Sequence, residues 1–283
     1  MLLFQSSVSI RAWGLLCSLV ILGALGCGAD QYEARLKQSK DYYNYLDRIE
    51  QHLAPKWSDG RIVESMRVPK QFSRILEPVA VKAEDGTETP VVDARQPDYM
   101  NLSFPVAELV AAWEAPFNVT VADGSAESRK AYIYILSNYW KFLGENPAEA
   151  LEYTKSIVTL VGDALENHLP PEKLENPDVE LHPKPGGYLP ASQYEVYTFA
   201  PKPITLAGAD RGSTVNYTFT MFAKRNGNIQ AFILVALPEN ISSQEKLVER
   251  IPMMLEHFQI TKVEPKPSAA QGGTTQPAPT SGF

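Results

Sequence analysis

Apolar and polar positions alternate most clearly in two runs near the C-terminal end of the chain. At 215–221 the odd positions are Val, Tyr, Phe and Met and the even positions are Asn or Thr, and at 229–237 every odd position is apolar. Such alternation is typical of strands with one face in the core, and Asn226-Gly227 between the runs favours a tight turn. The pattern predicts an antiparallel hairpin of strands 214–223 and 229–237.

The parity of the apolar positions also predicts how these two strands pair. Odd positions are apolar in both, so residues of like parity should lie opposite each other on the core face. This places Phe219 opposite Ile233 and requires a three-residue loop, 225–227, in which Gly227 supplies the positive φ.

A helical spacing of three, four or seven residues characterises residues 31–53. Pro55 cannot continue a helix, and charges of both signs occupy the other face, so the pattern predicts a long amphipathic helix that ends near Leu53. We expect its apolar stripe to pack on the following domain or on a second copy of the chain. The stripe consists of Tyr32, Leu36, Tyr43, Leu46, Ile49 and Leu53.

Further elements are predicted between this helix and the hairpin, and after the hairpin. Residues 57–101 resemble short strands and loops, with a turn at Asp85-Gly86. Residues 129–143 are β-branched and aromatic on both faces, which favours a central strand covered on both sides. Pro at a first helical position, or a capping box of Ser242 and Glu245, predicts helices at 105–113, 147–168 and 242–258.

Proline and acidic residues dominate the stretch from about 169 to 203, which we predict to be a long surface loop. Such loops often carry function. The polar residues available there for an enzyme site are Glu180, His182 and Tyr188. The tail at 263–283 is rich in Pro, Gly, Ser, Thr and Gln, and we expect it to be disordered because it cannot bury enough apolar surface.

The N-terminal segment is typical of a bacterial lipoprotein signal. Arg11 precedes an apolar run at 13–25, and Gly26-Cys27-Gly28 follows. About 13 apolar residues suit a secretory signal, whereas a membrane-spanning helix needs ~20. We therefore expect a signal peptide at 1–26, cleavage before Cys27 and attachment of a diacylglyceryl lipid to its thiol. An ordinary signal peptide or an uncleaved anchor is the alternative.

Cysteine usage and charge are consistent with that prediction. The chain has two cysteines, and Cys17 would leave with the signal, so the mature domain would contain no disulfide. The formal net charge of −7 makes nucleic acid an unsuitable partner, because phosphate contacts need clustered Lys and Arg. It also disfavours electrostatic attraction to anionic lipid, so acyl chains on Cys27 would have to hold the protein at the membrane.

Catalytic and metal-binding patterns are missing from the sequence. None of the four histidines stands at a zinc spacing to another, and no nucleophile elbow, phosphate-binding loop or dinucleotide fingerprint occurs. We therefore expect no cofactor, no metal and no catalytic residue.

The C-terminal third resembles the PsbP-like family. Its strand, tight turn and apolar strand end in Val235-Ala236-Leu237-Pro238, and an amphipathic helix follows. After that helix His257-Phe258-Gln259-Ile260 stands where the family has a Ser-Phe-Arg-Ile type motif, and residues 68–72 resemble the family's first strand. The resemblance implies an antiparallel sheet sandwiched by helices, and a non-catalytic role in binding partner proteins or in assembly.

These observations predict an α+β protein with an antiparallel sheet flanked by helices and a long N-terminal helix before it. Its parts would be the signal peptide, an anchor with its helix at 27–56, an α+β domain at 57–262 and the tail. The expected function is that of a non-catalytic, lipid-anchored protein of the bacterial cell envelope. It would lie on the outer face of the inner membrane or in the outer membrane and bind an unidentified envelope protein. The alternative is an envelope enzyme with a site between the sheet and the 169–203 loop.

Overall fold

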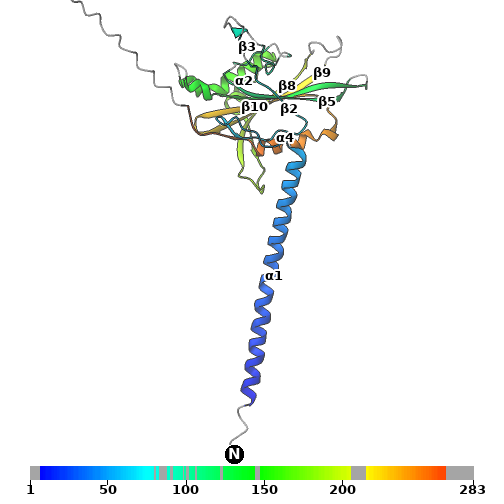
Figure 1. Ribbon diagram of the computed structural model, residues 1–283, viewed down its shortest axis with the longest axis vertical. Coiled ribbons are helices and arrows are strands. Elements are labelled where there is room, and N and C mark those ends of the chain that lie inside the picture. The colour runs from blue at the N-terminus through cyan, green and yellow to red at the C-terminus, as the bar shows by residue number, and fades with distance from the viewer. Residues whose placement is uncertain are drawn as a thin grey trace, which may run out of the picture. The chain divides into compact units, whose positions relative to one another are not determined.

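Figure 1 shows a computed structural model of the chain. It describes residues 7–79, 81–82, 88–89, 92–97, 99, 102–105, 107–121, 124–143, 147–204 and 215–265. The chain separates into two compact units, Met1–Gln51 and His52–Phe283.

The first unit is built on one helix, α1 (Ser7–His52), which contains almost all of the predicted amphipathic helix. Among the described residues, no helix has an apolar stretch long enough to cross a membrane. Cleavage before Cys27 and its lipidation stay predictions, as does packing of the helix stripe on a second copy. Four members of that stripe are exposed: Tyr32, Leu36, Tyr43 and Leu46.

The second unit is organised around a sheet of seven antiparallel strands. In spatial order they are β2 (Ser73–Ile75), β5 (Leu109–Thr120), β6 (Ala126–Ser137), β10 (Ile229–Pro238), β9 (Val215–Asn226), β8 (Ser192–Ile204) and β7 (Asp178–His182). Two smaller sheets are formed by β1 (Val63–Ser65) with β11 (Gln259–Ile260) and by β3 (Val81–Lys82) with β4 (Glu88–Thr89).

Each face of the large sheet carries its own hydrophobic layer, and a helix covers each (Figure 1). Helix α2 (Tyr153–Ala164) packs on the face that holds Tyr132 and Tyr134. Helix α4 (Leu247–Glu256) packs on the face that holds Ile133 and Ile135. The α+β class, with an antiparallel sheet flanked by helices and a long N-terminal helix, is confirmed.

The predicted hairpin is present as β9 and β10, but the predicted register is wrong. Phe219 pairs with Ala236 and Ile233 pairs with Phe222, so residues of opposite parity lie opposite each other. The turn contains two residues, and Gly227 has a φ of 65°, as the first position of a type II′ turn requires. Parity constrains the pairing only where a single face of the hairpin is buried. Both faces of β10 are buried, so either register puts apolar side chains in the core.

The helix predicted at 105–113 is also wrong, because Leu109 begins strand β5. The chain makes a single turn at this point, in which the N–H of Glu108 donates to the carbonyl of Pro105 at 2.9 Å. Beyond it, alternating apolar positions continue as far as Val119, which is the period of a strand. Pro116 is tolerated inside β5 because β2 pairs only with residues 112–114 and the ladder on that side ends before it.

The central strand predicted at 129–143 is β6, which ends earlier, at Ser137. Two 3₁₀ helices follow, η2 (Tyr139–Leu143) and η3 (Pro147–Ala150), and α2 then ends at Ala164, before the predicted His168. Residues 131–138 are all buried. The prediction that this strand is covered on both faces is therefore confirmed.

The stretch from 169 to 203 is not the predicted surface loop. It forms helix α3 (Pro171–Glu175) and two strands of the large sheet, β7 and most of β8. Tyr194 and Phe199 on β8 are completely buried, because β8 lies inside the sheet between β9 and β7. The prolines lie before, between and near the ends of these elements. A high proline content therefore does not distinguish short, proline-bounded elements from a loop.

Short strands predicted between 57 and 101 are confirmed by β1 and β2, although residues 68–72 themselves are not a strand. Ser242 begins the last helical region, where its hydroxyl accepts a backbone hydrogen bond from the 3₁₀ helix η4 (Ser243–Glu245). Lys246 then adopts a φ of 52° and α4 follows. The predicted turn at Asp85-Gly86 and the tail beyond residue 265 lie outside the described residues.

Candidate functional site

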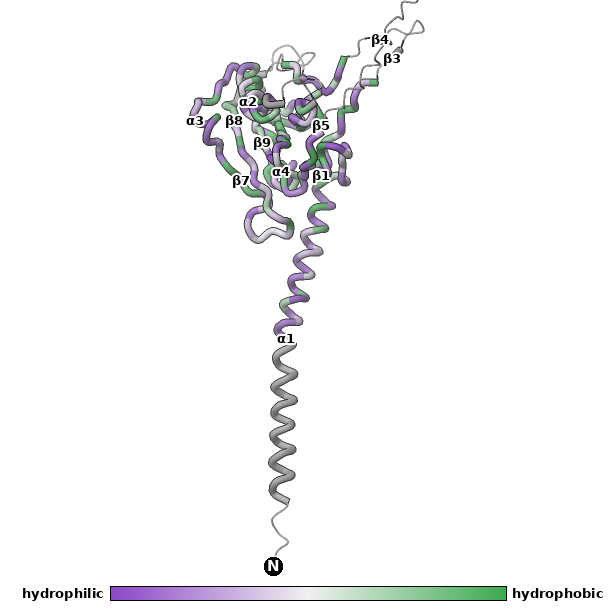
Figure 2. The backbone as a smooth tube through the Cα atoms, turned by 90° about the vertical axis from the view of Figure 1, so that its left-hand side faces the viewer, coloured by the Kyte–Doolittle hydropathy of each residue, from purple (hydrophilic) through white to green (hydrophobic). Residues whose placement is uncertain are grey.

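Strand β7 forms one margin of the large sheet and has an open outer edge. It pairs with β8 on one side, and the described residues place no further strand on the other. Figure 2 shows β7 at the margin of the second unit. Its first four residues are exposed. They include the apolar Val179 and Leu181, of which 56% and 42% of the surface is accessible to solvent. Exposed apolar side chains on an unpaired strand are unusual, because such edges favour association.

Local contacts hold β7 in place while leaving its outer edge open. Pro177 and Pro183 stand immediately before and after it, so the strand is limited to five residues. The Nζ of Lys173 donates to both carboxylate oxygens of Asp178, at 2.7 and 2.9 Å. His182 is buried, and its Nε2 lies 2.9 Å from Oε2 of Glu180.

Negative charge gathers on β7 and on the segments that flank it. Residues 171–195 contain five carboxylates but two lysines, Lys173 and Lys184. Both strand carboxylates, Asp178 and Glu180, are exposed to solvent. The acidic side chains are Glu172, Glu175, Asp178, Glu180 and Glu195. Lys173 pairs with Asp178 and Arg225 lies 3.3 Å from Glu195, so this margin of the sheet presents a negative potential to a partner mainly through Glu172, Glu175 and Glu180.

Strand β8 supports β7 from inside the sheet and is itself fixed to α4 and to the chain after it. The buried hydroxyl of Tyr194 donates to the carbonyl of Leu255 at 2.7 Å. The Nζ of Lys224 donates to Oγ of Ser192 at 2.9 Å and to the carbonyl of Phe258. Burial lowers the pKa of Lys224 to about 8. Rigid support of this kind keeps the open edge of β7 in a strand conformation.

The polar residues nominated for an enzyme site are only partly brought together. Glu180 and His182 form the 2.9 Å pair on β7, in which the carboxylate orients the imidazole. Tyr188 lies in the connection from β7 to β8, and 42% of its surface is exposed. Within the described part of the chain, no three His, Cys, Asp or Glu side chains are grouped so that they could hold a metal ion.

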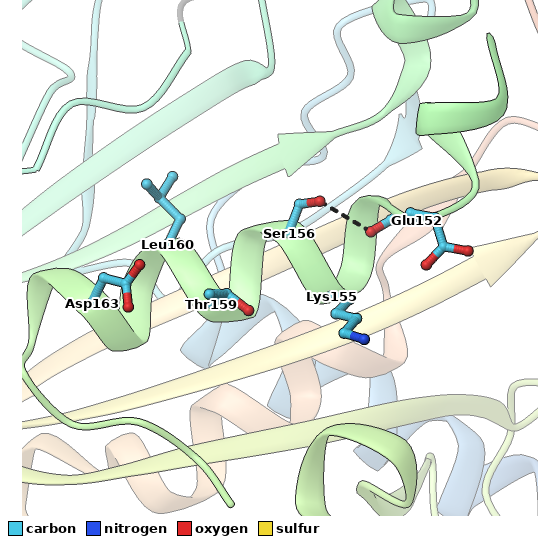
Figure 3. Close-up of a pocket in the computed structure, with 6 residues that line it drawn as sticks. All are labelled: Glu152, Lys155, Ser156, Thr159, Leu160 and Asp163. Atoms are coloured by element: carbon cyan, nitrogen blue, oxygen red, sulfur yellow. Dashed lines mark hydrogen bonds between the residues drawn. The ribbon is translucent and has the colours of Figure 1, made fainter. Parts of the chain in front are cut away.

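The described part of the second unit also carries two hollows elsewhere. Figure 3 shows the first, about 410 Å³, which lies along the solvent face of α2 between Glu152 and Asp163. The second, about 610 Å³, lies between the end of β10 and the start of α4, beside Leu237 and Ile251. It is the more apolar of the two. Pro252 lies in its wall and has no N–H, so the carbonyl of Val248 cannot receive the usual helical hydrogen bond.

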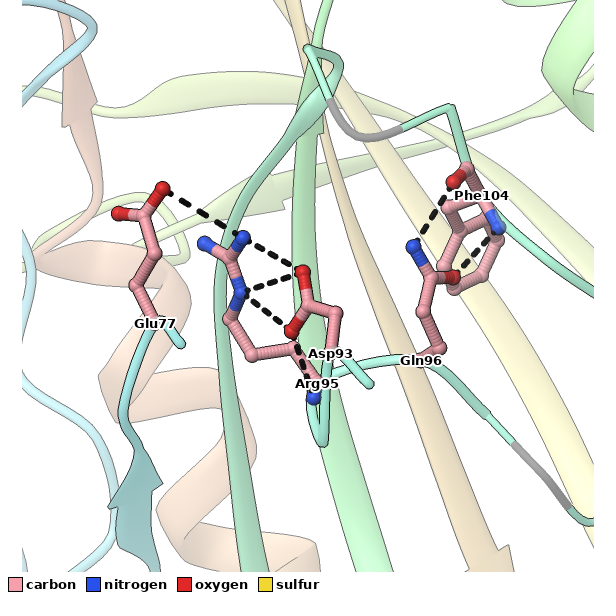
Figure 4. Close-up of polar contacts among 5 residues, drawn as sticks. All are labelled: Glu77, Asp93, Arg95, Gln96 and Phe104. Carbon is pink, nitrogen blue, oxygen red and sulfur yellow. Dashed lines mark hydrogen bonds and ion pairs between the residues drawn. The ribbon is translucent and has the colours of Figure 1, made fainter. Parts of the chain in front are cut away.

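A polar cluster ties together parts of the segment before β5 (Figure 4). The Arg95 guanidinium bonds both carboxylate oxygens of Asp93, with the shortest contact at 2.7 Å, and lies 3.6 Å from Glu77. These hydrogen bonds lower the pKa of Asp93 and raise that of Arg95. The Gln96 side chain bonds the backbone N–H and carbonyl of Phe104, at 2.7 and 2.9 Å. The polar side chains of this cluster are engaged with one another and with the backbone, which fits a structural role.

Comparison with known proteins adds no relative. No protein-family model, curated protein or solved structure matches the chain. The candidate surface therefore rests on its own geometry. The sequence placed a candidate functional surface in the 169–203 stretch that contains β7, but as a loop. The strand was missed although a signal was present, since residues 178–181 alternate acidic and apolar between two prolines.

Proposed function

We propose that this protein is a non-catalytic, lipid-anchored protein of the bacterial cell envelope, which binds a partner protein through β7. The observation that carries the binding role is the open edge of β7, where two apolar side chains and two carboxylates are exposed on a rigidly supported strand. Open edges of this kind are used for protein association by strand addition.

The anchoring part of the proposal rests on the sequence. The short apolar run and Gly26-Cys27 favour cleavage and lipidation at Cys27. The anchor would leave the domain outside the cytoplasm, on the outer face of the inner membrane or in the outer membrane. The finer assignment of the fold to the PsbP-like sandwich is part of this proposal, and it agrees with a sheet that has helices on both faces.

Lipid attachment is tested by metabolic labelling with palmitate. We expect the wild-type protein to incorporate the label and to remain with membranes. Cys27→Ser should lose the label and either stay uncut or leave the membrane fraction. A Cys27→Ser protein that labels and fractionates like the wild type would show that the anchor is wrong.

The binding surface is tested by a photocrosslinking amino acid at Val179, installed in the membrane-anchored protein in cells. We expect ultraviolet-dependent adducts to another envelope protein from this position. The control position is Thr159, which lies in the hollow on the solvent face of α2. Adducts of equal yield from both positions, or from Thr159 alone, would contradict the assignment of the surface.

A further inference from the structure

We infer that the outer edge of β7 accepts an extended segment of the partner as an eighth strand of the sheet, and that basic and apolar side chains alternate along this segment. The inference rests on the proposed protein-binding function and adds the chemistry of the partner. Three features of β7 carry it: its free backbone edge, the separation of its side chains onto two faces, and its charge.

The backbone of β7 supplies the hydrogen bonds for an added strand. In an antiparallel pair, alternate residues direct their N–H and C=O groups toward the neighbour and the remaining residues direct theirs away. Because the described residues pair β7 with β8 alone, the outward groups along Asp178–His182 are available to another chain. The prolines at 177 and 183 limit the added ladder to about five residues, since proline cannot donate to it.

The side chains of β7 differ between the two faces of the sheet. Glu180 pairs with Tyr194 and Asp178 with Val196, so both carboxylates lie on the α4 face. Val179 and Leu181 are therefore on the opposite face. Side chains that lie opposite each other on neighbouring strands point to the same face of the sheet and contact each other. A complementary segment has basic residues beside the carboxylates and apolar residues beside Val179 and Leu181, which requires strict alternation.

The same charges argue against a second copy of this chain as the occupant. Pairing β7 with its own copy would place the carboxylates of Asp178 and Glu180 near their counterparts on one face. Like charges on adjacent strands are destabilising. Acidic side chains therefore prevent self-association at this edge and select a basic partner, in the way that charged edge strands generally avoid unwanted pairing.

The probe for this inference is a fluorescent peptide with the core Lys-Val-Lys-Val-Lys between Gly-Ser flanks. It is titrated with the full-length protein purified in detergent, and fluorescence anisotropy reports binding. We expect saturable binding that weakens as salt is raised. A peptide of the same composition in block order, Lys-Lys-Lys-Val-Val, should bind at least about tenfold more weakly, because it cannot match both faces. Equal affinity of the two peptides would overturn the inference.

Charge reversal tests the surface on the protein. The variant with Asp178→Lys and Glu180→Lys should weaken binding of the alternating peptide by about tenfold or more. The matched control, Glu33→Lys with Glu50→Lys, changes the net charge equally on exposed positions of α1 and should alter binding by less than about twofold. Equal losses in the two variants would show that the peptide responds only to overall charge.

Peptide backbone variants give a test that does not depend on whether a protein variant folds. N-methylation of the valines removes donors from one edge of the extended peptide, and N-methylation of the lysines removes donors from the other. An added strand uses one edge, so one modified peptide should lose binding by about tenfold while the other stays within about twofold. If both bind as tightly as the unmodified peptide, strand addition is wrong.

These outcomes are distinct from a failure of the proposed function. Adducts at Val179 in cells together with failure of the peptide tests would leave β7 as the binding surface and remove strand addition. Absence of adducts at Val179 would remove the proposed binding function, and the further inference with it.

Discussion

The inner strands and the outer strand β7 are built in opposite ways, although they belong to the same sheet. Strand β10 is the central strand of the seven, between β6 and β9, and its residues from Ile229 to Ala236 are all buried. Strand β7 has one neighbour among the described strands and is buried only at its last residue, His182. Apolar residues on both faces suit a strand that is covered on both sides, whereas alternation of acidic and apolar residues suits an open margin.

The difference indicates where stability and binding reside. Burial of apolar surface is the main stabilising contribution, so the inner strands should dominate the free energy of unfolding. A strand that is exposed in the isolated protein contributes little to that free energy. Its apolar surface can be removed from water when a partner binds. Substitutions should therefore separate the two roles.

The largest expected effect comes from the centre of β10. Phe232 is fully buried and its ring packs edge-on against that of Tyr153, with centroids 5.5 Å apart. Phe232→Ala should lower the free energy of unfolding by about 3–5 kcal/mol, because it removes buried surface and leaves a cavity. Val179→Ala on β7 should change it by less than about 0.5 kcal/mol. Urea denaturation measures both, and similar losses in the two variants would remove the distinction between the strands.

The same contrast explains how much of the fold could be predicted. The spacing and type of the apolar residues identified the β9–β10 hairpin and the central strand β6, because each of these patterns lies within a short stretch of sequence. The register of Phe219 failed because burial on both faces removes the parity constraint. Strand β5 was missed because proline at position 105 also favours the first position of a helix. The margin position of β7 could not be predicted, since the order of strands in a sheet depends on pairings far apart in sequence.

A second, smaller loss is expected from a polar network beside the inner strands. The side chain of Gln230 is buried and its Oε1 accepts from the N–H and hydroxyl of Thr154, at 3.1 and 2.7 Å. Its Nε2 donates to the carbonyl of Leu151 at 3.0 Å. Gln230→Met keeps the volume but leaves these groups unpaired, so it should lower the free energy of unfolding by about 2–3 kcal/mol.

The matched control for this network is Gln193, an exposed glutamine on β8 next to β7. Gln193→Met should leave the free energy of unfolding within about 0.5 kcal/mol of the wild-type value. Urea denaturation of both variants at one pH gives the comparison. Indistinguishable midpoints would show that the buried hydrogen bonds add nothing beyond what an exposed glutamine contributes.

A pH-dependent effect is expected from the Asp93–Arg95 pair, in a segment that lies outside the large sheet. The hydrogen bonds from Arg95 lower the pKa of Asp93 in the folded protein, so the folded state binds fewer protons than the unfolded state near pH 4. The stabilisation is complete above the unfolded pKa of about 3.9 and is lost as pH falls through the lower folded value. Asp93→Asn should cost about 1–2 kcal/mol at pH 7.

Urea denaturation of the wild type and of Asp93→Asn at pH 7 and at pH 3 measures this dependence. The difference between the two proteins should be smaller at pH 3, where the wild-type carboxylate begins to gain a proton. Glu77 lies 3.6 Å from the same guanidinium but is largely exposed, so Glu77→Gln is the control and should have little effect at either pH. A difference for Asp93→Asn that grows toward pH 3 would contradict the assigned direction of the pKa.

The smallest effect is expected in the turn that joins the two inner strands. Gly227 has a φ of 65°, where a Cβ is unfavourable, so Gly227→Ala should lower the free energy of unfolding by about 1 kcal/mol. Gly162 in α2 gives a control of opposite sign. A Cβ there would meet its nearest atom, the carbonyl oxygen of Asn167, at 3.4 Å, and alanine favours the helix, so Gly162→Ala should add about 0.5–1 kcal/mol. Thermal unfolding of the two variants tests the pair together. A stabilising Gly227→Ala would mean that the turn is not of the type that sets the register of β9 and β10.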